Sequence, residues 1–91
     1  MSSEYDLIEG ALETARRSVR TNPQYAEKIL YEVRLVIGSM HQMAHDAGEE
    51  RKVIYYQGRM VSQYPPTDHN LSLHPPTARA LQNLREAMET P

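Results

Sequence analysis

The 91-residue sequence contains no cysteine, no phenylalanine and no tryptophan. Without cysteine the chain has no disulfide bond, no thiolate ligand for zinc and no cysteine nucleophile. It also lacks a run of about 18 apolar residues, the length that a membrane-spanning helix needs. The acidic start Met-Ser-Ser-Glu-Tyr-Asp has neither the basic region nor the apolar stretch of a secretion signal. We therefore expect a soluble protein of the cytoplasm.

Neither sign of charge dominates the chain. Ten basic and twelve acidic residues are interspersed along its whole length and give a net charge of −2. Broad binding to nucleic acid needs a basic surface, so this balance argues against it. The sequence also lacks a glycine-rich phosphate loop, a dinucleotide fingerprint and a Gly-x-Ser-x-Gly elbow, which are common signatures of enzymes. We predict a single, non-enzymatic domain over residues 1–91, small enough that oligomerisation would help to stabilise it.

Apolar residues recur at helical spacing in two long segments. The first segment predicts a helix over residues 4–21, with charged side chains on its other side. Asn22-Pro23 then ends one helix and begins the next, because asparagine is a good cap and proline is tolerated in the first helical turn. The second segment predicts a helix over residues 23–47, about 37 Å long, which ends before Gly48.

The helix predicted over 23–47 carries an apolar stripe that is wider than a coiled-coil seam and typical of a bundle. One row alternates in steps of four and three residues: Ala26, Leu30, Val33, Ile37, Met40, Ala44 and Ala47. A flanking row seven residues apart widens the stripe: Ile29, Val36 and Met43. The helix over 4–21 is too short to cover this stripe alone. We therefore predict twofold self-association through the uncovered part, centred on Leu30, Val33, Ile37 and Met40.

Residues 50–63 fit two structures. Val53, Tyr56, Met60 and Tyr64 would share one helical face, which favours a helix. The run Val-Ile-Tyr-Tyr is typical of a strand, however, and Gln-Gly after it is compatible with a two-residue hairpin turn. Because an isolated hairpin is marginal in water, and the long apolar stripe needs a cover, we predict a helix and keep the hairpin as the alternative.

The sequence Pro-Pro-Thr occurs twice in the next segment, at residues 65–67 and 75–77. The first copy ends an element and leads into turn-forming residues, so we predict a proline-stiffened loop over 64–76. The second copy opens an amphipathic helix, predicted over 75–88, where prolines are tolerated in the first turn. The chain is therefore expected to form an all-α bundle, in which the helix over 23–47 is one arm of an antiparallel helical hairpin.

All six aromatic side chains are tyrosines. Tyrosine is favoured where one side of a residue is packed and the other is wet, as at interfaces and stacking platforms. Five residues combine tyrosine with arginine over a short stretch and form the predicted binding site for a partner or ligand: Arg51, Tyr55, Tyr56, Arg59 and Tyr64. The alternative is that these tyrosines pack half-buried against the long helix.

Two other polar clusters have weaker claims to function. His41 and His45 are one helical turn apart, a spacing that a metal ion bridges, but Gln42 stands where a zinc protease of the His-Glu-x-x-His type has its glutamate. We predict no metal and no cofactor, with these two histidines as the weak candidates. Arg16 and Arg17 lie one turn from Glu13, so we expect a solvated helix face that is partly neutralised by local ion pairs.

His74-Pro75-Pro76 at the start of an amphipathic helix resembles the start of small phage-encoded helical proteins that sequester cyclic nucleotide immune signals. The resemblance covers few residues, lies at the opposite end of the chain from that family's motif, and has Leu73 where the family has tyrosine. It assigns no role to any residue of this chain.

These observations predict a small helical oligomer that binds a protein partner as an adaptor, inhibitor or regulator. The alternative is a protein that binds a nucleotide or another small anion with arginine and tyrosine at a subunit interface, as in a sequestering protein of the phage type. A metal-dependent enzyme that uses the two helical histidines is a distant third.

Overall fold

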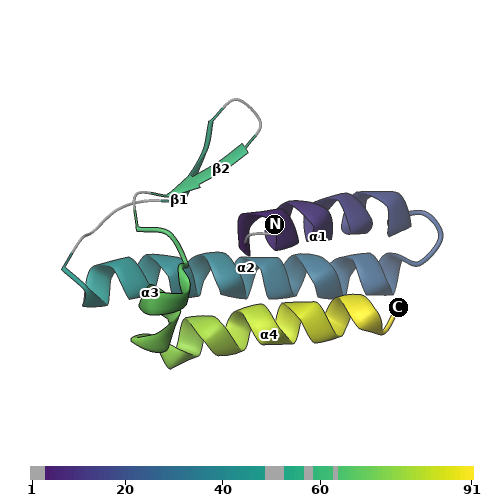
Figure 1. Cartoon of the computed structure of the whole chain (residues 1–91). Coiled ribbons are helices and arrows are strands. Elements are labelled where there is room, and N and C mark those ends of the chain that lie inside the picture. Colours follow the sequence, from purple (N-terminus) through teal and green to yellow (C-terminus); the bar gives the residue numbers. More distant parts are fainter. Residues whose placement is uncertain (1–3, 49–52, 57–58, 63) are drawn as a thin grey trace.

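The computed structural model describes residues 4–48, 53–56, 59–62 and 64–91. Its elements are, in chain order, α1 (Glu4–Ser18), α2 (Pro23–Asp46), β1 (Val53–Tyr56), β2 (Arg59–Ser62), α3 (Asp68–Ser72) and α4 (Pro75–Glu89). Figure 1 shows α2 between α1 and α4, with the two strands standing above this helical layer. The predicted all-α bundle around a long central helix is confirmed, and a two-stranded hairpin is added to it.

The corner between α1 and α2 follows from a single capping residue. The side chain of Asn22 accepts a hydrogen bond from the backbone N–H of Tyr25 at 3.3 Å, and Pro23 occupies the first turn of α2. Because a cap leaves the helical conformation, the preceding residues must turn before it. Helix α1 therefore ends at Ser18, three positions before the predicted boundary at residue 21.

Helix α2 spans 24 residues, close to the predicted range of 23–47. Its end is marked by Gly48, whose φ of 77° lies in the left-handed region that glycine adopts without strain. In Figure 1 the chain runs along α1, returns along α2 and runs back along α4, so both outer helices are antiparallel to α2. This arrangement contains the predicted antiparallel helical hairpin.

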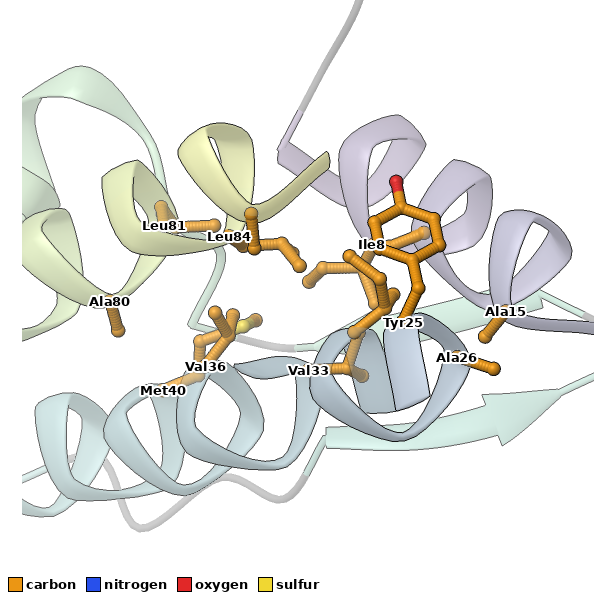
Figure 2. Packing of buried hydrophobic residues seen from close by; sticks show 13 residues of the cluster. Ile8, Ala15, Tyr25, Ala26, Val33, Val36, Met40, Ala80, Leu81 and Leu84 are labelled. Atoms are coloured by element: carbon orange, nitrogen blue, oxygen red, sulfur yellow. The ribbon is translucent and has the colours of Figure 1, made fainter. Parts of the chain in front are cut away.

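The core lies where α2 faces α1 and α4 (Figure 2). Its fully buried side chains come from all three long helices and include Ile8 from α1, Ile29, Val36 and Met40 from α2, and Leu81 and Leu84 from α4. The two outer helices are also joined directly, because Arg85 on α4 donates a hydrogen bond to the carboxylate of Glu4 on α1.

Burial in this core corrects the predicted self-association surface. Val33 is only 4% exposed and Met40 only 1% exposed, so neither side chain is available to a second subunit. The prediction was wrong for these two residues because α4, from the other end of the chain, covers the stripe that α1 leaves open. Ile37 is half-buried against the same core, and Leu30 is exposed.

The helix predicted over residues 50–63 is also wrong. Strands β1 and β2 form an antiparallel pair in which Val53 is opposite Ser62 and Tyr56 is opposite Arg59. The β-branched and aromatic residues of the run prevailed over its weak helical periodicity. The hairpin does not stand alone, since β1 contacts α2 and β2 contacts α1, and this support compensates for the marginal stability of an isolated pair of strands.

The proline-rich segment is more ordered than predicted. Inside the loop expected over 64–76, residues Asp68–Ser72 form α3, and the hydroxyl of Thr67 caps this helix by accepting a hydrogen bond from the N–H of Asn70 at 3.1 Å. The second Pro-Pro-Thr opens α4 as predicted, with His74 at the cap position. Among the described residues, no helix is both long enough and apolar enough to cross a membrane.

Candidate functional site

The predicted partner-binding residues are concentrated on the hairpin. Tyr55 and Tyr56 end β1, Arg59 begins β2, and the antiparallel register places Tyr56 directly opposite Arg59. Tyr64 follows β2 at the start of the proline-rich segment. Arg51 lies outside the described residues. The structure thus keeps the tyrosine and arginine positions of β1 and β2 together on one supersecondary unit.

The hairpin has edges of its own. Within the described part of the chain, its sheet consists of β1 and β2 alone, so each strand has one side that is not paired with a neighbouring strand. Unpaired strand edges present a row of backbone N–H and C=O groups, which proteins use to add a strand from a partner. The contacts of the hairpin with α1 and α2 hold this unit at one place on the bundle.

A small cavity lies where the end of α2 meets α3 and the start of α4. Its volume is about 200 Å³, and it is lined by Met43, Asp46, Ala47, Tyr64, Asn70, Leu73 and His74. Pockets for drug-sized ligands usually measure about 300 to 1,000 Å³. This cavity is therefore of a size for one side chain of a partner rather than for a whole nucleotide.

His74 ties the wall of this cavity to the rest of the bundle. Its Nε2 lies 2.9 Å from Asp46 Oδ2 at the end of α2, and its Nδ1 lies 2.7 Å from Thr77 Oγ1. The hydroxyl of Thr77, which is fully buried, donates in turn to the carbonyl oxygen of Ser39 at 3.0 Å. Helix α4 is thereby anchored to α2 by a chain of polar contacts that begins at its first turn.

The two ring nitrogens of His74 have different partners. Nε2 faces the carboxylate of Asp46, which only accepts, so Nε2 is the donor in that contact. Nδ1 faces the hydroxyl of Thr77, a group that both donates and accepts. The ring is therefore held between the end of α2 and the first turn of α4.

Asp46 is stabilised as a carboxylate by its neighbours. The side-chain amide of Gln42 donates to it at 2.7 Å and is the main cause that lowers its pKa, followed by the contact with His74. The order carboxylate, imidazole, hydroxyl superficially matches a nucleophilic triad. The hydroxyl of Thr77 is buried and already bonded to a backbone carbonyl, however, so it is a structural group and not a nucleophile.

A second groove runs between α2 and α4 at the other end of the bundle. It measures about 380 Å³ and is lined by Lys28, Glu32, Asn83, Glu86, Ala87 and Thr90. Beside it, the hydroxyl of Tyr25 donates to the carbonyl of Met88 at 3.1 Å and fixes the end of α4. The charged lining mixes one cation with two carboxylates, which gives it no preference for an anion.

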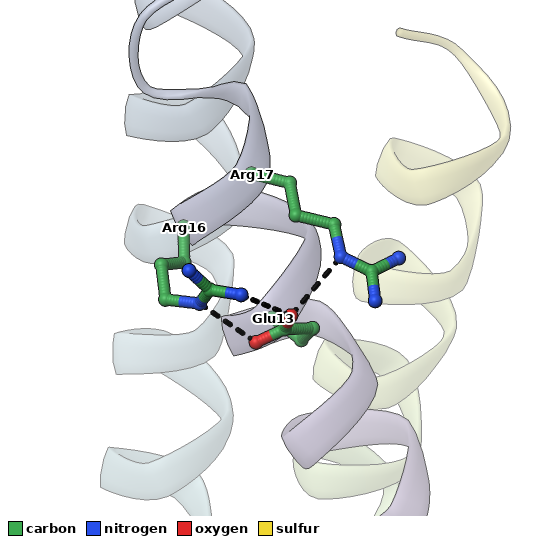
Figure 3. A network of polar contacts seen from close by, with 3 residues as sticks. All are labelled: Glu13, Arg16 and Arg17. Atoms are coloured by element: carbon green, nitrogen blue, oxygen red, sulfur yellow. Dashed lines mark hydrogen bonds and ion pairs between the residues drawn. The ribbon is translucent and has the colours of Figure 1, made fainter.

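The arginines of α1 are paired locally, as predicted. Glu13 accepts hydrogen bonds from Arg16 at 2.5 and 2.9 Å and from Arg17 at 3.0 Å (Figure 3). The contact with Arg16 is the largest cause that lowers the pKa of Glu13 to about 2. This face of α1 is a solvated ion-pair cluster, and its positive charge is reduced by the carboxylate between the two guanidinium groups.

The predicted metal candidates remain on the surface of α2. His41 and His45 are both exposed on this helix. Among the described residues, no three histidine, aspartate or glutamate side chains gather closely enough to hold a metal ion.

Comparisons with known protein families, with curated proteins and with solved structures find no match for this chain. Its function is therefore inferred from the geometry described above.

Proposed function

We propose that this chain is a non-enzymatic binding protein, a small helical oligomer of the cytoplasm that recognises a protein partner as an adaptor, inhibitor or regulator. The observation that carries the proposal is the hairpin, which stands above the helical layer and bears Tyr55, Tyr56 and Arg59 (Figure 1). Helices α1, α2 and α4 form the scaffold, and the hairpin is attached to this scaffold as the recognition unit. Binding units placed in this way on a rigid frame are common in proteins.

Three features suit a protein as the ligand. The unpaired edges of β1 and β2 offer backbone hydrogen bonds to an extended segment of a partner. Tyrosine and arginine are the residue types that most often supply the binding energy of an interface. The cavity beside Tyr64 adds a place for one side chain of the partner. Together these features support a peptide or a protein loop as the bound element.

The proposal is tested by affinity capture from the native host with the wild-type chain and with the variants Tyr55→Ala, Tyr56→Ala and Arg59→Ala. We expect each variant to weaken capture of the same partner while far-ultraviolet circular dichroism keeps its helical signal. Arg79→Ala is the matched control, because this arginine is exposed on α4. Capture that is equal for the wild type and all three hairpin variants would contradict the proposal, and loss of the helical signal would assign the tyrosines to the core.

The second candidate function is binding of a nucleotide or another small anion at a subunit interface. It is favoured by the register that sets Tyr56 opposite Arg59, since one position offers a ring for stacking and the other a guanidinium for phosphate. A thermal-shift screen of nucleotides separates the two functions. A true ligand at 100 times its Kd would stabilise the fold by about 2.7 kcal/mol. No stabilisation by any nucleotide would leave the protein partner as the proposed function.

A further inference from the structure

The side of α2 that faces away from the core carries an exposed apolar patch. Leu30 is 47% exposed, Tyr31 is 56% exposed and Leu35 is 42% exposed, and they lie within two turns of one helix. Together with three other exposed residues they form what we call the outer face of α2: Glu27, Leu30, Tyr31, Arg34, Leu35 and Gly38. Large exposed apolar side chains that gather in this way mark an interaction surface.

The charged members of the outer face have no ion-pair partner within the described part of the chain. Glu27 and Arg34 are both exposed, and neither forms a salt bridge there, in contrast to Glu13, which pairs with two arginines. One carboxylate and one guanidinium therefore flank Tyr31 along the same row of the helix, at positions four residues before it and three residues after it. A surface that covers this row and removes water from it must offer an opposite charge near each end.

A second copy of the outer face, placed antiparallel to the first, brings its Arg34 near Glu27 and its Glu27 near Arg34. Three pairs of positions on this face share one midpoint, between positions 32 and 33: Glu27 with Gly38, Leu30 with Leu35, and Tyr31 with Arg34. When two α2 helices pair antiparallel about a twofold axis at that midpoint, Tyr31 of one copy is level with Arg34 of the second copy. Glu27 is then level with Gly38 of the second copy, and its carboxylate lies about one turn from the same Arg34.

We propose that the outer face of α2 is the dimer interface of this protein, in an antiparallel, twofold pairing centred between positions 32 and 33. In this pairing Arg34 of each copy stacks on Tyr31 of the other copy and meets its Glu27. Gly38 has no side chain, and the space beside it is open, with no atom of its own chain within 4 Å of a Cβ built there. The second helix can therefore come close to α2 at this position. Leu30 and Leu35 cover this polar row from its two sides. The proposal rests on the oligomeric state included in the proposed function.

The interface is expected to be modest. A single helix pair buries less than the roughly 1,600 Å² of a standard stable complex. We therefore expect a dimer whose dissociation constant lies in the range of about 1 µM to 1 mM and that exchanges with monomer. Sedimentation velocity over this concentration range measures the equilibrium without immobilising the protein.

Charge reversal gives a test with an internal rescue. Arg34→Glu places two carboxylates on each side of the axis and should weaken dimerisation about tenfold or more, and Glu27→Arg should act likewise. The double variant Glu27→Arg, Arg34→Glu restores opposite charges and should recover part of the affinity, since the stacking on Tyr31 is not restored. Arg79→Glu on α4 makes the same change of charge elsewhere and should leave dimerisation unchanged.

The possible failures are distinguishable. A wild-type chain that stays monomeric up to about 1 mM, the weak limit of the expected affinity, would overturn both the dimer and the oligomeric part of the proposed function. If both single charge reversals leave the dissociation constant unchanged, only the outer face as the interface would be overturned. The same holds if the double variant dimerises more weakly than either single variant. All of these positions are exposed, so circular dichroism of each variant should match that of the wild type.

Discussion

Replacing Thr77 by valine tests the polar anchor that joins α4 to α2. Valine has nearly the shape of threonine and the same branched Cβ, so the change removes a hydroxyl without opening a cavity. The hydroxyl is fully buried, donates to the carbonyl of Ser39 at 3.0 Å and faces Nδ1 of His74 at 2.7 Å. Both partners would lose this contact, and the His74 side chain is only 12% exposed.

The expected cost follows mainly from Nδ1 of His74, because the carbonyl of Ser39 lies inside α2 and keeps its helical hydrogen bond. Leaving a buried polar group without its partner costs about 1 to 3 kcal/mol. A domain of this length is stable by roughly 5 to 14 kcal/mol, so a loss of about 2 kcal/mol is a large share of the total. Since 1 kcal/mol shifts the melting temperature of a small domain by about 4 to 8 °C, Thr77→Val should lower it by about 8 to 16 °C.

Urea denaturation followed by circular dichroism measures this free energy, and Thr90→Val is the matched control. The hydroxyl of Thr90 donates to the carbonyl of Glu86 at 3.0 Å, but it is exposed and water replaces the contact. The control should change the free energy of unfolding by no more than about 0.5 kcal/mol. If Thr77→Val is as stable as Thr90→Val, the polar anchor contributes nothing to the free energy of unfolding.

Three further results are expected. Leu84→Ala should lower the free energy of unfolding by about 2 to 5 kcal/mol in urea denaturation, because Leu84 is fully buried, and a smaller loss would contradict the core described here. In dilute protein, Gly38→Ala should raise the free energy of unfolding by about 0.5 to 1 kcal/mol, because Gly38 lies inside α2. Gly48→Ala should lower it, because the φ of Gly48 is 77°. The opposite signs would refute the conformations assigned to these two glycines. Because the pKa of Asp46 is lowered in the folded state, its ionised carboxylate stabilises the fold at pH values above the unfolded pKa of about 3.9. This stabilisation is lost as the pH falls through the lower, folded pKa. Asp46→Asn should therefore be less stable than wild type at neutral pH and similar to it in acid.

The long helices could be predicted from the sequence because their signals are local. Apolar periodicity, the Asn22-Pro23 cap and the glycine at position 48 bounded α2 closely, and the second Pro-Pro placed the start of α4. The hairpin could not be chosen over a helix, because its stability depends on contacts with α1 and α2 that lie far away in sequence. The cap at Thr67 had a local signal, a threonine before Asp68, that went unused.

The candidate site stays a prediction, but the placement of its hairpin residues is now known. Its tyrosines and arginine were selected from composition, and the register places Tyr56 opposite Arg59. The stripe of α2 was correctly identified as apolar, but which of its residues are covered depends on where α4 packs, and a periodicity does not contain that information. His74 was missed as an anchor because its partner Asp46 is 28 residues away.

The most direct test of the proposed function is amide hydrogen exchange of the chain with and without its captured partner. We expect backbone amides of residues 53–56 and 59–62 to exchange more slowly in the complex, since the partner pairs with or covers the hairpin. Amides along the groove between α2 and α4 should exchange at an unchanged rate. Protection that falls on that groove and leaves the hairpin unaffected would contradict the proposed function.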